Sequence, residues 1–225
     1  MNFYSKGQKM GHHIDENICQ LAWYAECMNR ALAEIRGFSP PARDVRFHHS
    51  LFIINFMSLI DLAVEFYGPL FKQQFIKKLD GTGGQTGENN EGYLRELRNA
   101  TIHRGMDIAS SGTVISNHVR AIAPEEIFDR HRKKGPFKPF ASTLLEIFEI
   151  SRLIGGSLVL EFAEPWFREM ESREFNEMRD QYLRDLEENT FLPEWAINAA
   201  RENIDQIPFM EIRAHNSHTL RILLS

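Results

Sequence analysis

Three residues that could act together on a phosphodiester lie within a stretch of six, namely Arg98, Asn99 and His103. A helix turns about 100° per residue, so Asn99 and His103 lie one above the other, with Glu96 on nearly the same line. Arg98 lies about 100° round from Asn99, and its long side chain can lean across to the same patch. An imidazole titrates near neutral pH and a guanidinium pairs with phosphate oxygens. Together they could transfer protons and neutralise a phosphate without a metal.

A short, well-delimited helix is expected to carry these residues. It follows residues 80–90, a loop so rich in Gly and Asn that no helix is expected to run through it. Asn89 or Asn90 is expected to cap the helix, and Gly105 to end it. The expected core side of the helix carries Leu94, Leu97 and either Ala100 or Thr101.

The segment Arg98-Asn99-Ala100-Thr101-Ile102-His103 resembles the Arg-x4-6-His signature of the HEPN superfamily (higher eukaryote and prokaryote nucleotide-binding domains). The resemblance covers roughly residues 43–164, and its specificity is concentrated in these six residues. It implies a helical bundle that forms a homodimer. It also implies a metal-independent endoribonuclease of the kind found in toxin–antitoxin and phage-defence systems, with a protein antitoxin as a further partner.

Carried over from the family, the resemblance gives His103 the acid–base chemistry at the ribose 2′-hydroxyl or the leaving oxygen. Arg98 would stabilise the phosphate, Asn99 would position His103 or the phosphate, and Glu96 would be a less direct helper. A homodimer would supply a second proton-transfer group, and the products would carry 2′,3′-cyclic phosphate and 5′-hydroxyl ends. Gly105 occupies the place of a Tyr found in the variant paired with nucleotidyltransferase antitoxins, so regulation through such a Tyr is not expected here.

The alternative function is a non-catalytic, HEPN-like helical module that binds a nucleotide, RNA or a partner protein. Arg, Asn and His are common on solvent-exposed helix faces, and short motifs arise often by chance. Arg98 and His103 would then form a polar contact between two copies. The enzyme is favoured if His103 from two subunits faces a shared open cleft with both Arg98 side chains. The module is favoured if His103 is buried against its own bundle, or is exposed with no partner across from it.

The densest basic run of the chain is Arg130-His131-Arg132-Lys133-Lys134, and Gly135-Pro136 follows it. Arg130, Arg132, Lys133 and Lys134 are candidate substrate-binding residues, because cationic side chains hold a nucleic-acid backbone. A solvated charged loop explains the same run equally well. The net charge of −5 limits any RNA-binding site to a local patch.

The bulk properties are those of a soluble, cytoplasmic globular protein, with 225 residues, 43% hydrophobic and 25% charged. Met1–His13 has no apolar core, so no signal peptide is expected. The longest apolar run, Leu51–Val64, is too short to span a bilayer. Cys19 and Cys27 match no zinc spacing and are expected to be reduced core residues. No metal site, cofactor motif or membrane interaction is expected.

The fold class expected from helical periodicity is all-α, an antiparallel bundle of about five to seven helices. Residues 1–165 would form the HEPN-like bundle and residues 166–225 a C-terminal helical extension, with Pro165 breaking the chain between two helices. An irregular insertion at 106–139 would hold a small hairpin. The helices are expected at residues 15–35, 43–67, 70–79, 92–104, 140–164, 166–189 and 193–205.

The helix at 43–67 is apolar nearly all round, as expected of a helix surrounded by others. Asn55, Ser58, Asp61 and Glu65 form a narrow polar line along it, which would help orient His103, line a dimer cleft or face solvent. Gly155-Gly156 in a later helix would allow another helix to approach closely. The tail, residues 207–225, is apolar enough that we expect it to pack against another protein surface, such as a partner subunit.

Overall fold

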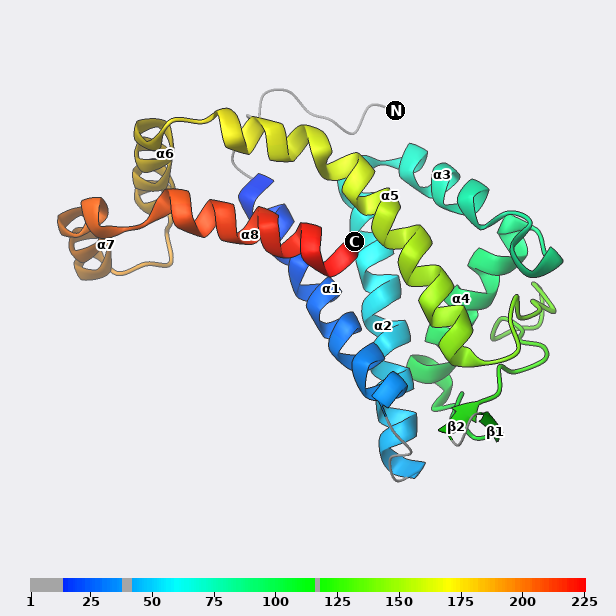
Figure 1. Cartoon of the computed structure of the whole chain (residues 1–225). Coiled ribbons are helices and arrows are strands. Elements are labelled where there is room, and N and C mark those ends of the chain that lie inside the picture. Colours follow the sequence, from blue (N-terminus) through cyan, green and yellow to red (C-terminus); the bar gives the residue numbers. More distant parts are fainter. Residues whose placement is uncertain (1–13, 38–41, 116–117) are drawn as a thin grey trace.

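The computed structural model describes residues 14–37, 42–115 and 118–225, and it confirms an all-α protein (Figure 1). The described part contains eight α-helices, one more than the upper end of the expected range. Residues 1–13, 38–41 and 116–117 lie outside the described residues, and with them the turn expected at Ser116-Asn117. The helices are α1 (Ile14–Gly37), α2 (Ala42–Tyr67), α3 (Pro69–Leu79), α4 (Gly87–Arg104), α5 (Leu144–Ser172), α6 (Phe175–Glu188), α7 (Glu194–Glu202) and α8 (Phe209–Leu224).

Helix α2 is the centre of the bundle, and α1, α3, α4 and α5 all pack on it. Phe52 and Phe56 of α2 are fully buried, and the ring of Phe52 stacks on Phe148 of α5 with centroids 4.2 Å apart. The apolar window of α2 runs from Asp44 to Tyr67 and is longer than the run expected from sequence. By length and composition alone it could cross a membrane, a property that core helices of globular proteins share.

Helix α5 continues through Pro165 to Ser172, so the expected break at Pro165 is wrong. Proline removes one helical hydrogen bond and crowds the carbonyl four residues before it. Ala163, Phe167 and Met170, on both sides of the proline, are buried in the core. Their packing outweighs the local cost, because most helix stability in proteins comes from tertiary contacts.

The C-terminal helix α8 docks on α1 and α5 of its own chain, which identifies what the apolar tail covers. Gly156 permits this contact, since a Cβ there would lie 2.9 Å from the carbonyl oxygen of Leu224. Gly155 likewise lies against the ring of Phe56. The expected packing role of the two glycines is therefore confirmed. Cys19 of α1 is exposed and Cys27 is half-buried, so the expectation that both are core residues is wrong.

The insertion between α4 and α5 contains the expected hairpin, formed by β1 (Gly112–Ile115) and β2 (His118–Ala121). The strands are antiparallel, with Val114 opposite Val119. Arg120 Nη1 donates to the carbonyl oxygen of Ile35 at 3.1 Å, which ties β2 to the end of α1. The hairpin and the rest of the insertion lie at one side of the bundle, and α6 and α7 project from the other (Figure 1).

Candidate functional site

Helix α4 carries the motif, and it begins earlier than the sequence suggests. Thr86 is the N-cap and its hydroxyl accepts from the backbone N–H of Asn89, so the expectation of an Asn cap is wrong. Asn90 is instead fully buried inside the helix, where its amide donates to the carbonyl oxygens of Leu79 and Thr82. The side chain thus holds the Gly-rich loop against α4. Gly105 ends the helix in the left-handed conformation at φ 61°, as expected.

Arg98 faces α2 rather than Asn99 and His103, so the expected lean across the helix is wrong. Its Nη1 donates to Asp61 Oδ2 at 3.1 Å, and Asp61 Oδ1 accepts from Arg95 at 3.2 Å. Arg95 also bonds to Glu91 at 2.8 Å. This chain of ion pairs fixes the direction of Arg98. Asp61, from the polar line of α2, thus orients Arg98 and not His103.

His103 lies in the last turn of α4 with its side chain in solvent. It makes no hydrogen bond or ion pair with any residue that the structure describes. It lies five positions after Arg98, which places the two side chains about 140° apart round the helix. Within one chain, therefore, Arg98 and His103 do not converge on a common point.

Glu96 is only 8% exposed, although its place in the sequence suggests a solvent-facing line with His103. Its carboxylate accepts from Asn99 Nδ2 at 2.9 Å and from Arg104 Nη2 at 3.4 Å. Arg104 Nη1 also donates to the carbonyl oxygen of Phe128 at 2.7 Å. Arg104 is absent from the residues predicted for the site, because nothing in the sequence signals the approach of Phe128. It joins α4 to the insertion.

The basic run forms an ordered turn that is connected to α4 through Phe128. The backbone N–H of Lys134 donates to Asp129 Oδ1 at 3.0 Å, and this bond lowers the pKa of the Asp129 carboxyl group. Arg132 is left-handed at φ 54°, with its guanidinium 5.2 Å from the centre of the Phe128 ring. The four candidate substrate-binding side chains are all exposed: Arg130, Arg132, Lys133 and Lys134. We call residues 130–134 the basic turn.

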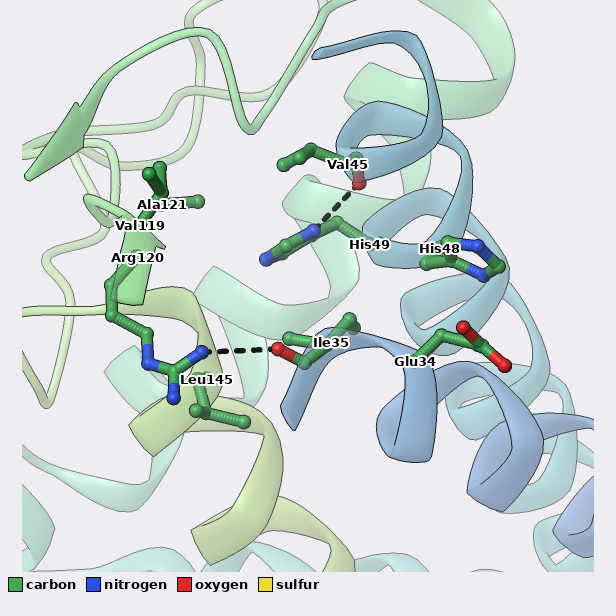
Figure 2. A pocket seen from close by; sticks show the side chains of 9 residues that line it. All are labelled: Glu34, Ile35, Val45, His48, His49, Val119, Arg120, Ala121 and Leu145. Carbon is green, nitrogen blue, oxygen red and sulfur yellow. Dashed lines mark hydrogen bonds between the residues drawn. The ribbon is translucent and has the colours of Figure 1, made fainter. Parts of the chain in front are cut away.

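A second group of polar residues, not anticipated from sequence, lines a pocket between α1, α2, β2 and α5 (Figure 2). His49 is 4% exposed, and its Nδ1 lies 2.7 Å from the carbonyl oxygen of Val45. That distance assigns the ring proton to Nδ1, which leaves Nε2 as a buried acceptor with no partner among the described residues. Burial lowers the pKa of His49, so its imidazole is neutral near pH 7.

Among the described residues, no three His, Cys, Asp or Glu side chains lie close enough together to hold a metal ion. Comparison with protein-family models, with curated proteins and with solved structures finds no match to this chain. The geometry of α4 and its neighbours is therefore the basis for a functional proposal.

Proposed function

We propose that this chain is a HEPN-like, metal-independent endoribonuclease that acts as a dimer, in toxin–antitoxin or phage-defence biology. The observation that supports this best is the state of His103. Its imidazole is exposed and unengaged at the end of a helix that Arg104 ties to the segment bearing the basic turn. An unpaired imidazole beside a cationic surface suits proton transfer on a bound phosphodiester.

The dimer is needed because Arg98 and His103 of one chain point in different directions. A contact that brings two α4 helices face to face would let Arg98 of one copy approach His103 of the other. The surface at this end of α4 favours such a contact. Arg46 bonds to the carbonyl oxygen of Gly105 at 2.9 Å, and the neighbouring Phe47, Ile102 and Met106 all expose apolar side chains. A second copy would remove them from water.

In the proposed reaction, one His103 takes the proton of a ribose 2′-hydroxyl as its oxygen attacks the adjacent phosphorus. The bond to the 5′-oxygen breaks, and the His103 of the partner returns a proton to that oxygen. Arg98 neutralises the charge that develops on the phosphate. The products carry 2′,3′-cyclic phosphate and 5′-hydroxyl ends, and the basic turn holds the RNA backbone beyond the scissile bond.

A second candidate function is a non-catalytic module that binds a nucleotide, RNA or a partner protein such as an antitoxin. The observation that favours it is the ion pair between Arg98 and Asp61, together with the buried Glu96 bonded to Asn99. These contacts give three of the four motif residues a structural role within one chain. Only His103 remains without such a role among the described residues.

Cleavage of a mixed RNA pool in EDTA distinguishes the two functions. We expect the wild-type protein to cleave and His103→Ala to lose activity by roughly 10²- to 10⁴-fold, the usual contribution of a positioned acid or base. His218→Ala is the matched control, because His218 is also exposed on a helix, α8, far along the chain. A folded His103→Ala variant that cleaves as well as His218→Ala would contradict the enzyme. RNA binding without cleavage by all three proteins would favour the module.

A further inference from the structure

The segment 174–206, which we call the arm, contains α6 and α7 and projects from the bundle (Figure 1). Helix α6 packs on α7 and on α8. Two large aromatic residues of the arm are exposed to solvent: Phe191, between α6 and α7, is 95% exposed, and Trp195, at the start of α7, is 74% exposed. Aromatic side chains of this size bury 150–250 Å² each when covered. Two such side chains exposed on a projecting element are a candidate contact surface.

The arm is also strongly acidic, and its charge indicates what covers it. It holds nine acidic and three basic residues, a net charge of −6 in a chain whose total is −5. Five of its carboxylates are exposed and form no ion pair with a described residue, namely Glu174, Glu177, Glu188, Glu194 and Glu202. Two arms would repel each other, so contact between the arms of two copies is disfavoured. The occupant must combine an apolar surface with positive charge.

The insertion between α4 and α5, at the other side of the bundle, carries both exposed apolar side chains and cations. The hairpin exposes the apolar side chains of Val114, Ile115 and Val119, and Val114 is 69% exposed. All four residues of β1 are exposed to solvent. The basic turn follows the hairpin in the chain, and Arg130 and Lys133 form no ion pair with a described residue. Residues 130–138 contain no carboxylate at all. In Figure 1 the arm and the hairpin lie on opposite sides of the bundle, so an arm does not reach the hairpin of its own chain.

We propose that the arm of one copy docks on the hairpin and basic turn of a second copy. Phe191 and Trp195 then cover the exposed valine and isoleucine side chains, and the carboxylates of the arm lie against the cations of the turn. Each copy has one arm and one receiving surface, so contacts of this kind join copies into a closed pair or a longer assembly. A docked arm also competes with RNA for the basic turn, a consequence that rests on the proposed function.

The test is a charge exchange between two variants, measured by light scattering at low salt. One variant, Glu188→Lys/Glu194→Lys, reverses two charges on the arm, and the other, Lys133→Glu/Lys134→Glu, reverses two charges on the turn. We expect each variant alone to associate at least about tenfold more weakly than the wild type. An equimolar mixture should recover association, because the native arm of one variant meets the native turn of the other. Glu65→Lys, an exposed α2 carboxylate, serves as the control and should leave association unchanged.

A second variant pair tests the apolar half of the contact. Trp195→Ala and Phe191→Ala remove exposed side chains, so circular dichroism should show an intact fold while association falls. A wild-type protein that stays monomeric at every concentration would overturn the proposal. Association that both charge variants retain would also overturn it. The second result would not contradict the dimer formed through α4, because that dimer does not use the arm. The two proposed interfaces can therefore be tested independently.

Discussion

Arg98, Asn99, Glu96 and His103 lie within two turns of one helix, yet their surroundings separate them into two groups. The first three are bonded to Asp61 or to one another, and burial of Glu96 makes its two bonds necessary. Burying a charged carboxylate without hydrogen-bond or ion-pair partners costs far more free energy than leaving it exposed to water. His103 has no such constraint within the described part of the chain. At the scale of the residue, it is therefore the best target for a mutation meant to change chemistry without changing the fold.

The titration of His49 makes the stability of the folded protein depend on pH, in a direction that follows from its lowered pKa. Burial lowers its pKa in the folded protein below 6.5, its ordinary value, and the nearby charges of His48 and Arg120 act in the same direction. Above pH 6.5 the ring is neutral in both states, and this group does not change stability. As the pH falls below that value the unfolded chain binds the proton first, so the folded state loses stability until the lower pKa is reached.

We therefore expect the free energy of unfolding, measured by chemical denaturation, to fall as the pH is lowered from about 6.5 to about 5. His49→Gln should make this fall shallower, because glutamine does not titrate. His218→Gln is the control, as an exposed histidine on α8. Equal pH dependence in His49→Gln and the wild type would show that the pocket histidine does not cause the effect.

At the scale of the element, close packing at two glycines decides where α8 lies. Helix α5 is long and contains both Gly155-Gly156 and Pro165, which are poor choices for an isolated helix. The glycines remove the side chains that would hold α2 and α8 away from α5. The two glycines lower the helix propensity of α5, but they allow it to pack closely against α2 and α8.

We expect Gly156→Val to displace α8 and to destabilise the protein by roughly 1–3 kcal/mol, the usual cost of overpacking. The added side chain meets the backbone of Leu224, 2.9 Å from the new Cβ, and backbone cannot move as a flexible side chain does. Thermal unfolding measures the loss, and limited proteolysis should cut before α8. Ser157→Val places the same side chain on the exposed neighbouring position and should cost only helix propensity. Equal melting temperatures in the two variants would contradict the packing role of Gly156.

At the scale of the whole molecule, charge is divided between two ends. The arm carries a net charge of −6, and the basic turn carries four cations on the side where α4 joins the insertion. A net charge of −5 for the whole chain conceals this division. Under the proposed function, this division would let an acidic protein hold an RNA backbone at one surface and repel it elsewhere.

The salt dependence of RNA binding measures the contribution of the basic turn. We expect Lys133→Gln/Lys134→Gln to weaken binding of a mixed-sequence single-stranded RNA and to reduce the slope of log affinity against log salt by about 1.4, since each single-strand phosphate contact contributes about 0.7. Lys77→Gln/Lys78→Gln, on the exposed face of α3, is the matched control. If the slope of log affinity against log salt falls equally in both variants, the basic turn has no specific role in RNA binding.

The sequence by itself determined the all-α class, the central place of α2, the hairpin and the glycine that ends α4. These depend on helical periodicity, on strand-like alternation and on the conformational freedom of glycine, all of which are local properties of the chain. The close-packed Gly155-Gly156 pair was also predictable, because only a packing role explains two glycines inside a strongly apolar helix. The charge of the basic run was visible from its residues, although its ordered shape was not.

Only the tertiary structure decided which way Arg98 points, what Glu96 contacts and where α5 ends. Asp61 lies 37 residues from Arg98 in the chain, and Phe128 lies 24 from Arg104, so no local spacing reports either contact. Packing against the core carries α5 past Pro165, where propensity alone would stop it. The buried acceptor of His49 depends on four segments that meet only in the folded protein. Side-chain direction and burial are set by these distant neighbours, whereas the elements themselves are set by the residues within them.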